Sequence, residues 1–160
     1  MSRVGMLEIA ETVTEQDIET VKGLLSEYAE SLDFDLCFQN FAQELASLPG
    51  EYARPDGCIL LARQAGQTAG CVALRSLGNG ICEMKRLYVR PRFRRRGIGR
   101  ALAEAVVKQA RAIGYSRMRL DTVPSMKDAR SLYRSLGFEQ IDAYRYNPIE
   151  GAEFMELRLA

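Results

Sequence analysis

The chain has 160 residues, of which 47% are hydrophobic and 27% are charged, and its 22 basic residues nearly balance 21 acidic ones. This composition is typical of one compact globular domain, and the near-neutral charge argues against wholesale binding to nucleic acid or to an anionic membrane. The sequence contains no histidine, which excludes a histidine catalytic triad and a histidine-ligated zinc site.

The first part of the chain is predicted to form one strand and two helices. Residues 6–11 alternate well enough for a short strand. Thr14, with Asp17 three residues later, resembles a helix N-cap, and apolar residues then recur at three- and four-residue steps from 16 to 32. A second apolar stretch at 38–48 ends at Pro49 and Gly50, which are typical of a helix end.

The middle of the chain predicts three strands and a long helix. Residues 58–63, 68–76 and 81–89 are rich in apolar and β-branched side chains, and turns at Gly66 and at 78–80 separate them. This pattern indicates consecutive antiparallel strands joined by hairpins. A basic loop at 90–96 leads into residues 97–113, whose apolar positions share one helical face and which end at Gly114.

The last part predicts a half-buried strand at 116–122, a helix at 126–136 closed by Gly137, and a hairpin of residues 138–143 and 153–159. The order is therefore β-α-α-β-β-β-α-β-α-β-β, a mixed α/β arrangement with one layered sheet and helices on both faces. Neither an internal repeat nor a linker divides it, so we expect a single domain over residues 1–160.

The hydropathy of the chain and its cysteines indicate in which cellular compartment the protein is expected. No apolar run approaches the roughly 18 residues that span a bilayer, and the N-terminus has no signal-type core, so we expect a cytoplasmic protein without membrane contact. The cysteines form no C-x-x-C pair and mostly lie in apolar segments; they are Cys37, Cys58, Cys71 and Cys82. We expect core thiols and no bound metal.

The turn at 94–99 is the strongest candidate binding site. Gly97 and Gly99 lie in the first turn of the predicted helix, where unpaired N–H groups and the helix dipole attract an anion such as phosphate. Basic residues gather around it: Lys85, Arg86, Arg90, Arg92, Arg94, Arg95, Arg96 and Arg100. A Walker loop is excluded because no Gly-Lys-Ser/Thr occurs, and a dinucleotide fingerprint because position 102 is leucine. The turn therefore predicts a pyrophosphate site of another kind.

Two motifs give this turn its context. Arg94-x-x-Gly97-x-Gly99, after a strand ending Leu87-Tyr88-Val89-x-Pro91, resembles the Arg/Gln-x-x-Gly-x-Gly/Ala motif of the GNAT acetyltransferase superfamily. The stretch Ala129-x-x-Leu132-Tyr133-x-x-Leu136-Gly137-Phe138 is similar to that family's later helix and its Gly-Phe exit into a strand. The element order fits over nearly the whole chain. The resemblance implies a mixed, mostly antiparallel GNAT-type sheet of about seven strands.

The resemblance also implies acetyl-CoA as the co-substrate, lying between the strands that end at Val89 and Thr122 with its pyrophosphate on the turn. The implied cofactor-binding residues are Leu87, Tyr88, Val89, Arg94, Arg95, Arg96, Gly97, Ile98, Gly99, Arg100, Ala129 and Tyr133. Main-chain groups of Leu87 and Val89 are expected to bind the pantetheine arm, and an N–H near Val89 is expected to polarise the thioester carbonyl.

Glu83 and Tyr133 are the catalytic residues that the resemblance implies. An alkyl ammonium of pKa about 10.4 must lose a proton before attack, and several family members carry a glutamate base four residues before the position of Leu87. Strand parity puts Glu83 and Leu87 on one face if no bulge intervenes. The alternatives to a Glu83 base are that Glu83 is a salt-bridged glutamate and that a water chain takes the proton.

Tyr133 matches the family tyrosine that donates a proton to the departing thiolate, and the alternative is that Tyr133 is a core aromatic residue. Met126 replaces a frequent asparagine, so a polar contact to the pantetheine is in doubt.

The sequence says less about the amine that accepts the acetyl group than about the cofactor. Tyr28, Phe38 and Tyr144 are candidates to line its pocket, with core packing as the alternative for Tyr28 and Phe38, and Asp35 is a candidate for attracting a cationic amine. The expected reaction is acetyl transfer to a primary amine of a small molecule or peptide by direct attack in a ternary complex. A non-catalytic acetyl-CoA sensor is the competing hypothesis, and a homodimer is left open. A nucleic-acid module is disfavoured because aromatics do not interleave the arginines.

Overall fold

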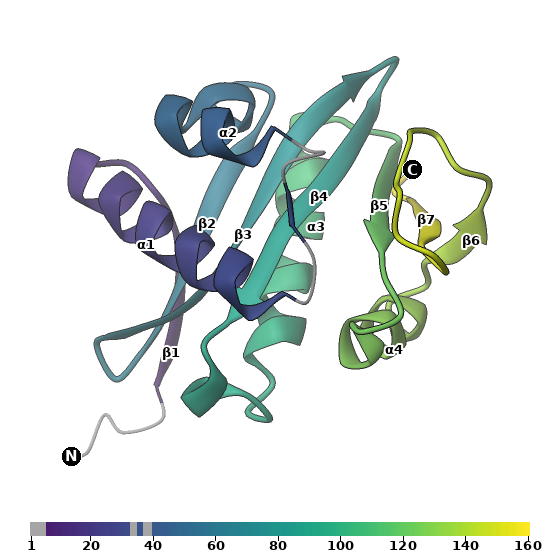
Figure 1. Ribbon diagram of the computed structural model, residues 1–160. Helices are drawn as coiled ribbons and strands as arrows, with labels where there is room; N and C mark the ends of the chain where they lie inside the picture. Colours follow the sequence, from purple (N-terminus) through teal and green to yellow (C-terminus); the bar gives the residue numbers. More distant parts are fainter. Residues whose placement is uncertain (1–5, 33–34, 37–39) are drawn as a thin grey trace.

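The computed structural model describes residues 6–32, 35–36 and 40–160 and contains a seven-stranded sheet of order β1-β2-β3-β4-β5-β7-β6 (Figure 1). Its strands are β1 (Leu7–Glu11), β2 (Cys58–Gln64), β3 (Gln67–Gly78), β4 (Ile81–Val89), β5 (Arg117–Thr122), β6 (Glu139–Ile141) and β7 (Glu153–Arg158). Among the described residues every neighbouring pair is antiparallel except β4 and β5. The predicted mixed, mostly antiparallel sheet is confirmed.

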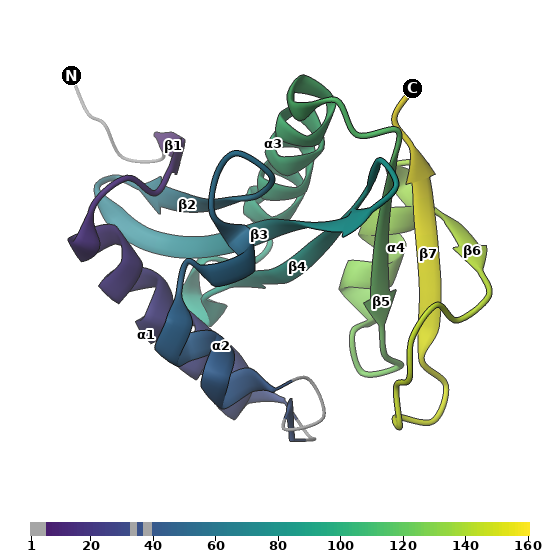
Figure 2. The same ribbon diagram turned by 90° about the horizontal axis from the view of Figure 1, so that it is seen from above.

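Helices cover both faces of this sheet (Figures 1 and 2). The principal ones are α1 (Glu15–Ser31), α2 (Phe41–Ser47), α3 (Ile98–Ile113) and α4 (Lys127–Ser135), with short 3-10 turns at η2 (Gly50–Tyr52) and η3 (Pro91–Phe93). Thr14 caps α1 as predicted, because its side chain accepts from the backbone N–H of Asp17 while the Asp17 carboxylate accepts from the backbone of Thr14. Gly114 ends α3 in the left-handed conformation.

Each face of the sheet has its own apolar core. On the α1 side, Val21 and Leu24 belong to one cluster with Ile59 and Leu61 of β2. On the α3 side, the intervening β2 residue Leu60 joins a second cluster, which also contains α3 side chains and extends to α4. This alternation along one strand is what a sheet buried on both faces requires.

The described cysteines lie in these cores as free thiols, as predicted: Cys58, Cys71 and Cys82. Burial raises the pKa of Cys71 to about 12, so it is not a thiolate at neutral pH. Cys37 lies outside the described residues. None of the helices in the described part of the chain has the length and apolar character that a membrane crossing requires.

Two boundaries differ from the sequence prediction. The helix expected at 38–48 begins at Phe41 in the described part of the chain, preceded by Asn40 in the left-handed conformation. The strand expected at 138–143 is only the short β6, because the residues after it leave the sheet edge: Tyr144 and Asn147 make side-chain hydrogen bonds to β4 and β5.

A bulge in β4 changes the faces of its side chains. Lys85 pairs with Ala73 of β3 and Tyr88 pairs with Cys71, so β4 carries an extra residue at this point. Arg86 sits in the bulge with φ 61°, an uncommon value for a residue other than glycine. Before and after it, Met84 and Leu87 pack on the α3 core, whereas Tyr88 packs on the α1 core.

The bulge corrects the parity expected for Glu83. Glu83 is bonded to Arg75 and Tyr144 on the α1 face of the sheet, whereas Leu87 packs on the α3 core. The shared face was expected only for a strand without a bulge, and the extra residue in β4 reverses the alternation, so Glu83 and Leu87 lie on opposite faces.

Candidate active site

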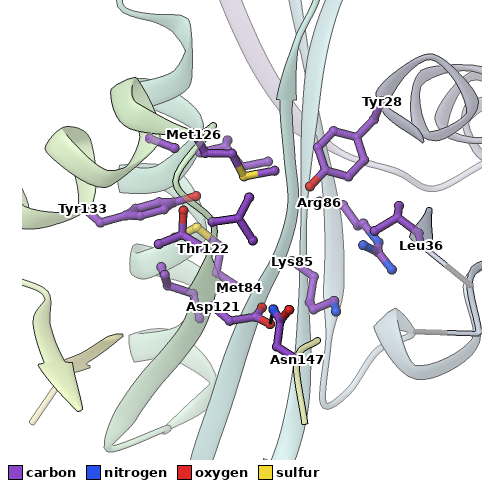
Figure 3. Close-up of a pocket in the computed structure, with 14 residues that line it drawn as sticks. Tyr28, Leu36, Met84, Lys85, Arg86, Asp121, Thr122, Met126, Tyr133 and Asn147 are labelled. Atoms are coloured by element: carbon purple, nitrogen blue, oxygen red, sulfur yellow. Dashed lines mark hydrogen bonds between the residues drawn. The ribbon is translucent and has the colours of Figure 1, made fainter. Parts of the chain in front are cut away.

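A pocket opens where β4 and β5 separate. The two parallel strands pair only from Ile81 to Glu83 of β4 and from Arg117 to Arg119 of β5, and beyond these residues they diverge. The pocket is lined by residues 84–87 of β4, by 120–123 at and after the end of β5, by Met126, Ala129 and Tyr133, and by Tyr28, Leu36 and Asn147. Figure 3 shows Thr122 and Tyr133 on one side of this opening and Tyr28 and Arg86 on the other.

In the part of the chain that the structure describes, the edge of β4 that faces this opening has no neighbouring strand beyond Glu83. Leu87 lines the pocket and is half-buried, as is Val89. An extended ligand lying beside β4 can therefore bond to main-chain groups in the way that another strand would. The side chain of Tyr88 points to α1, with its ring 5.8 Å from the ring of Tyr28. Only the main chain of Tyr88 can therefore contact a ligand that lies beside β4.

The turn at 94–99 leads into α3. Gly97 is the N-cap of the helix with φ 78°, and its carbonyl accepts from the N–H of Ala101 at 3.0 Å. The first N–H groups of the helix precede this bond and have no intrahelical acceptor, an arrangement that suits an anion. The Ile98 side chain is buried in the core, so this residue offers the turn only its backbone.

Glycine at position 99 is not required by the packing of the protein itself. A Cβ there would meet Val89 Cγ2 at 3.8 Å and Leu132 Cδ2 at 4.0 Å, which are ordinary contact distances, and Gly99 does not have a positive φ. A ligand that approaches the backbone closely gives a physical reason for glycine at this position.

The arginines in and beside the turn are exposed, and several of them contact neighbouring groups. Arg94 donates to the carbonyl of Val89 at 2.9 Å. The guanidinium groups of Arg92 and Arg96 lie 4.8 Å and 5.6 Å from the ring centroid of Phe93, which is itself buried. Arg100 bonds the hydroxyl of Ser135 on α4, and Arg95, with φ 64°, makes the turn. These arginines concentrate positive charge in the segment that leads into α3, whereas Arg86 and Arg90 form ion pairs with Glu44 and Glu27.

Tyr133 packs in the core and also lines the pocket. Its ring packs 5.7 Å from the ring of Phe138, while the residue also lines the pocket beside Ala129. Burial raises its pKa, with smaller contributions from Tyr28 and Asp121. The hydroxyl therefore stays protonated at neutral pH and is a hydrogen-bond donor.

Thr122 is a pocket residue to which the sequence assigned no role beyond a strand end. It is buried, and its hydroxyl has no hydrogen-bond partner among the residues that the structure describes. An unpartnered buried hydroxyl costs about 1–3 kcal/mol unless a ligand satisfies it. Met126, at the asparagine position of the family motif, lines the same pocket, so Thr122 offers a polar group close to the place where the expected one is missing.

Glu83 is held in an ion-pair network outside the pocket lining. Its carboxylate is fully buried and accepts from Arg75 Nε at 2.8 Å and from the Tyr144 hydroxyl at 2.6 Å. Arg145 forms a further ion pair with it. The salt-bridged glutamate is thus what the structure contains, and these donors stabilise its negative charge.

The residues predicted to line the acceptor pocket lie in different places in the structure. Tyr28 lines the pocket, and burial raises its pKa. The Tyr144 hydroxyl instead donates a hydrogen bond to the Glu83 carboxylate. Phe38 lies outside the described residues, and Asp35 is exposed beside that segment. The structure therefore brings Tyr28, Leu87, Ala129 and Tyr133 together at one pocket.

Three further polar residues line the pocket, and the sequence had named only Lys85 among them, as one of the basic residues around the turn at 94–99. They are Lys85 of β4, Asp121 of β5 and Asn147 of the β6–β7 loop. The Asn147 amide donates to the Asp121 carboxylate at 3.0 Å. Strand parity was the available signal for Asp121, since charged residues alternate with Met118 and Leu120 along this strand. Within the described residues no cluster of His, Cys, Asp and Glu has a geometry that suits a metal ion.

Comparisons with known proteins agree on one family. The profile of the Acetyltransferase (GNAT) family matches residues 19–138. An uncharacterized N-acetyltransferase of Schizosaccharomyces pombe is 38% identical over 162 aligned residues, covering 100% of this chain and 99% of the relative. The crystal structure of a putative acyl-CoA N-acyltransferase from Klebsiella pneumoniae has a TM-score of 0.73 at 27% identity and covers 97% of this chain and 99% of its own.

A third structure, yncA from Salmonella typhimurium, is described as a putative acetyltransferase with its cofactor acetyl-CoA. Its TM-score is 0.69 at 19% identity, with 96% of this chain and 94% of the other covered, and it supports the fold. The matched residues include the turn, β4 and Tyr133. The chain therefore belongs to the GNAT acetyltransferase family and is an acetyl-CoA-dependent N-acetyltransferase.

Proposed function

We propose that the protein transfers the acetyl group of acetyl-CoA to a primary amine of a small molecule or peptide by direct attack within a ternary complex. The observation that carries the proposal is the separation of β4 and β5 beyond Glu83 and Arg119, with a pocket lined from both faces of the sheet. The thioester arm enters from the side of α4 and the amine from the side of α1. The two reactants then meet between the strands, so attack needs no covalent enzyme intermediate.

Three observations support the cofactor part of the proposal. The turn presents helix N–H groups and arginines to the pyrophosphate. The free edge of β4 at Leu87 and Val89 offers main-chain groups to the pantetheine amides. The unpartnered hydroxyl of Thr122 lies in the same pocket. The residues present fit acetyl-CoA, and acetyl-CoA would supply the activated acyl group.

Tyr133 is the proposed proton donor to the leaving thiolate. Its raised pKa keeps the proton on the phenol until a stronger base appears. A nearby donor stabilises a thiolate as it forms, whereas the intact thioester sulfur is a weak acceptor. The interaction is thus stronger in the transition state than before it.

Release of the CoA thiol across a panel of amines tests the proposal. The panel holds amino acids, polyamines, aminoglycosides and peptides with free N-termini, and a reaction without acceptor gives the background. We expect at least one amine to raise CoA release well above background. Initial rates at several concentrations of both substrates should give intersecting double-reciprocal lines. Parallel lines would contradict direct attack, and acetyl-CoA binding without turnover on any amine would favour the sensor.

A further inference from the structure

We propose that Lys85, and not Glu83, takes the proton from the acceptor ammonium, and that Asp121 stabilises the charge that Lys85 then carries. The inference rests on the proposed amine acceptor and assigns a further residue at the same site. Neither Lys85 nor Asp121 had a role in the family-derived expectations. The proposal follows from how the two strands present these side chains at the pocket.

The register of β4 and β5 places Lys85 and Asp121 on the same side of the sheet. Glu83 is paired with Arg119 in the parallel ladder, and Lys85 and Asp121 follow two residues later on their strands, where the strands have begun to diverge. Both side chains line the pocket, together with Asn147. Figure 3 shows Lys85, Asp121 and Asn147 in the same part of the pocket.

The other candidate bases are less suited. Glu83 is fully buried, does not line the pocket, and is already bonded by Arg75, Tyr144 and Arg145. Tyr28 and Tyr133 have raised pKa values, so at neutral pH they are donors. The chain contains no histidine.

Asp121 is arranged as an anionic partner. Its carboxylate accepts from the Asn147 amide at 3.0 Å and lies 3.8 Å from Arg145. These contacts hold the carboxylate in place at the pocket. Once Lys85 has taken a proton, a carboxylate in the same pocket lowers the energy of the new ammonium group.

The surroundings of Lys85 give it an uncharged fraction at neutral pH. The residue is 7% exposed. Burial is the largest cause that lowers its pKa, from 10.5 to about 7, and neighbouring cations lower it further while anions raise it. The charged neighbours are Arg86 on β4, Arg75 on β3, Asp121 on β5 and Glu44 on α2. An amine with this pKa is an efficient general base near neutral pH.

The proposed reaction releases one proton for each acetyl group transferred. The uncharged Lys85 nitrogen accepts one proton from the acceptor ammonium, and the freed lone pair forms the C–N bond at the thioester carbonyl carbon. The C–S bond breaks, and CoA leaves as a thiolate. Tyr133 donates its proton to the sulfur and regains one from the attacking nitrogen. Lys85 returns its proton to solvent, so an ammonium and acetyl-CoA give an amide, CoA and one proton.

The pH dependence of kcat/KM in Lys85→Arg and Lys85→Met tests this assignment, with the amine of highest CoA release as the probe. Lys85→Arg keeps the positive charge but cannot deprotonate, so it separates a base from a group that only binds substrate. We expect kcat at pH 7 to fall about 100-fold or more in both variants. The rising limb near pH 7 should move toward the pKa of the free amine, about 10.

Two outcomes would overturn the assignment. One is a wild-type kcat in Lys85→Arg. The other is loss of the limb near pH 7 in Glu83→Gln while Lys85→Arg retains it, which would make Glu83 the base. Acetyl-CoA affinity, measured by calorimetry, should change less than about threefold in both Lys85 variants, since Lys85 lies on the acceptor side. A failure of the proposed function would instead appear as no transfer by the wild-type protein to any amine.

A readout without turnover gives an independent check. In protein carrying 13C-labelled lysine, the Lys85 resonance is identified by its absence from Lys85→Met, and its chemical shift is followed with pH. We expect a titration midpoint near 7 in the free protein. Adding an electrically neutral acceptor analogue should leave the resonance titrating. A midpoint near 10.4, the ordinary lysine value, would contradict the proposal.

Discussion

Replacing Lys85 by methionine should stabilise the protein below pH 7 and have little effect near pH 10. The pKa of Lys85 falls from 10.5 to about 7 on folding, chiefly because the amine is buried. Between these values the unfolded chain holds more protons than the folded one, so the free energy of unfolding rises with pH. Below pH 7 both states are protonated, and the full cost of burying the charge is present.

The size of the effect follows from the shift. A difference of roughly 3.5 pKa units at 1.36 kcal/mol per unit gives an upper value of about 5 kcal/mol below pH 7, falling to about 0.4 kcal/mol at pH 10.5. Methionine has similar length and carries no charge, so Lys85→Met removes this term. Lys85 has interactions in the folded state that the substitution removes, so we expect a smaller gain of about 2–4 kcal/mol at pH 6.

Urea unfolding at pH 6, 8 and 10 measures this effect. The control is Lys108→Met, which replaces an exposed lysine of α3. The free energies of unfolding of the wild type and Lys85→Met should converge as pH rises, while the difference for the control stays constant. If wild-type protein and Lys85→Met showed parallel pH dependence, Lys85 would not be a buried amine with a lowered pKa.

Three further variants test other parts of the structure. Tyr133→Phe should lower kcat about 100-fold with little change in acetyl-CoA affinity; unchanged turnover with an unchanged pH profile would refute its role. Glu44→Ala should lower the urea unfolding free energy by about 3–5 kcal/mol, because it strands Arg86, which Glu44 bonds at 2.9 and 2.8 Å. Thr122→Val should weaken acetyl-CoA binding by about threefold to tenfold in calorimetry, whereas Thr20→Val on α1 should leave binding unchanged.

Burial by itself raises the pKa of Glu44, but the hydrogen bonds and charge of Arg86 outweigh it and the net pKa is lowered. A carboxylate with a lowered pKa stabilises the folded state above its unfolded pKa, and this stabilisation is lost as pH falls through the folded pKa. Acid should therefore weaken the contact between α2 and the β4 bulge.

Local periodicity and turn chemistry predicted most of the elements. Thr14, Gly97 and Gly114 act at helix ends as expected, because capping depends on neighbouring residues only. The turn that leads into α3 was also predictable, since its glycines and arginines are close together in the sequence. These features need no knowledge of tertiary contacts.

The bulge and the acceptor side depend on long-range contacts. Arg86 adopts φ 61° while its guanidinium pairs with Glu44, which is far away in the sequence. The residues next to Arg86 in the sequence do not predict a bulge. The network at Glu83 likewise needs Arg75 and Arg145 from other elements. Parity without a bulge therefore placed Glu83 on the face of Leu87, and the sequence grouped Lys85 with the basic residues of the turn although it lines the pocket.

The central claim is that acetyl-CoA binds along β4 with its pyrophosphate on the turn before α3. Calorimetric titration of acetyl-CoA into the wild type, Gly99→Trp and Gly23→Trp tests it most directly. A Cβ at Gly23 meets no atom within 4 Å, so that variant controls for adding an indole to a helix. Wild type and Gly23→Trp should bind alike, and Gly99→Trp should show almost no binding. Equal affinity in all three proteins would contradict the claim.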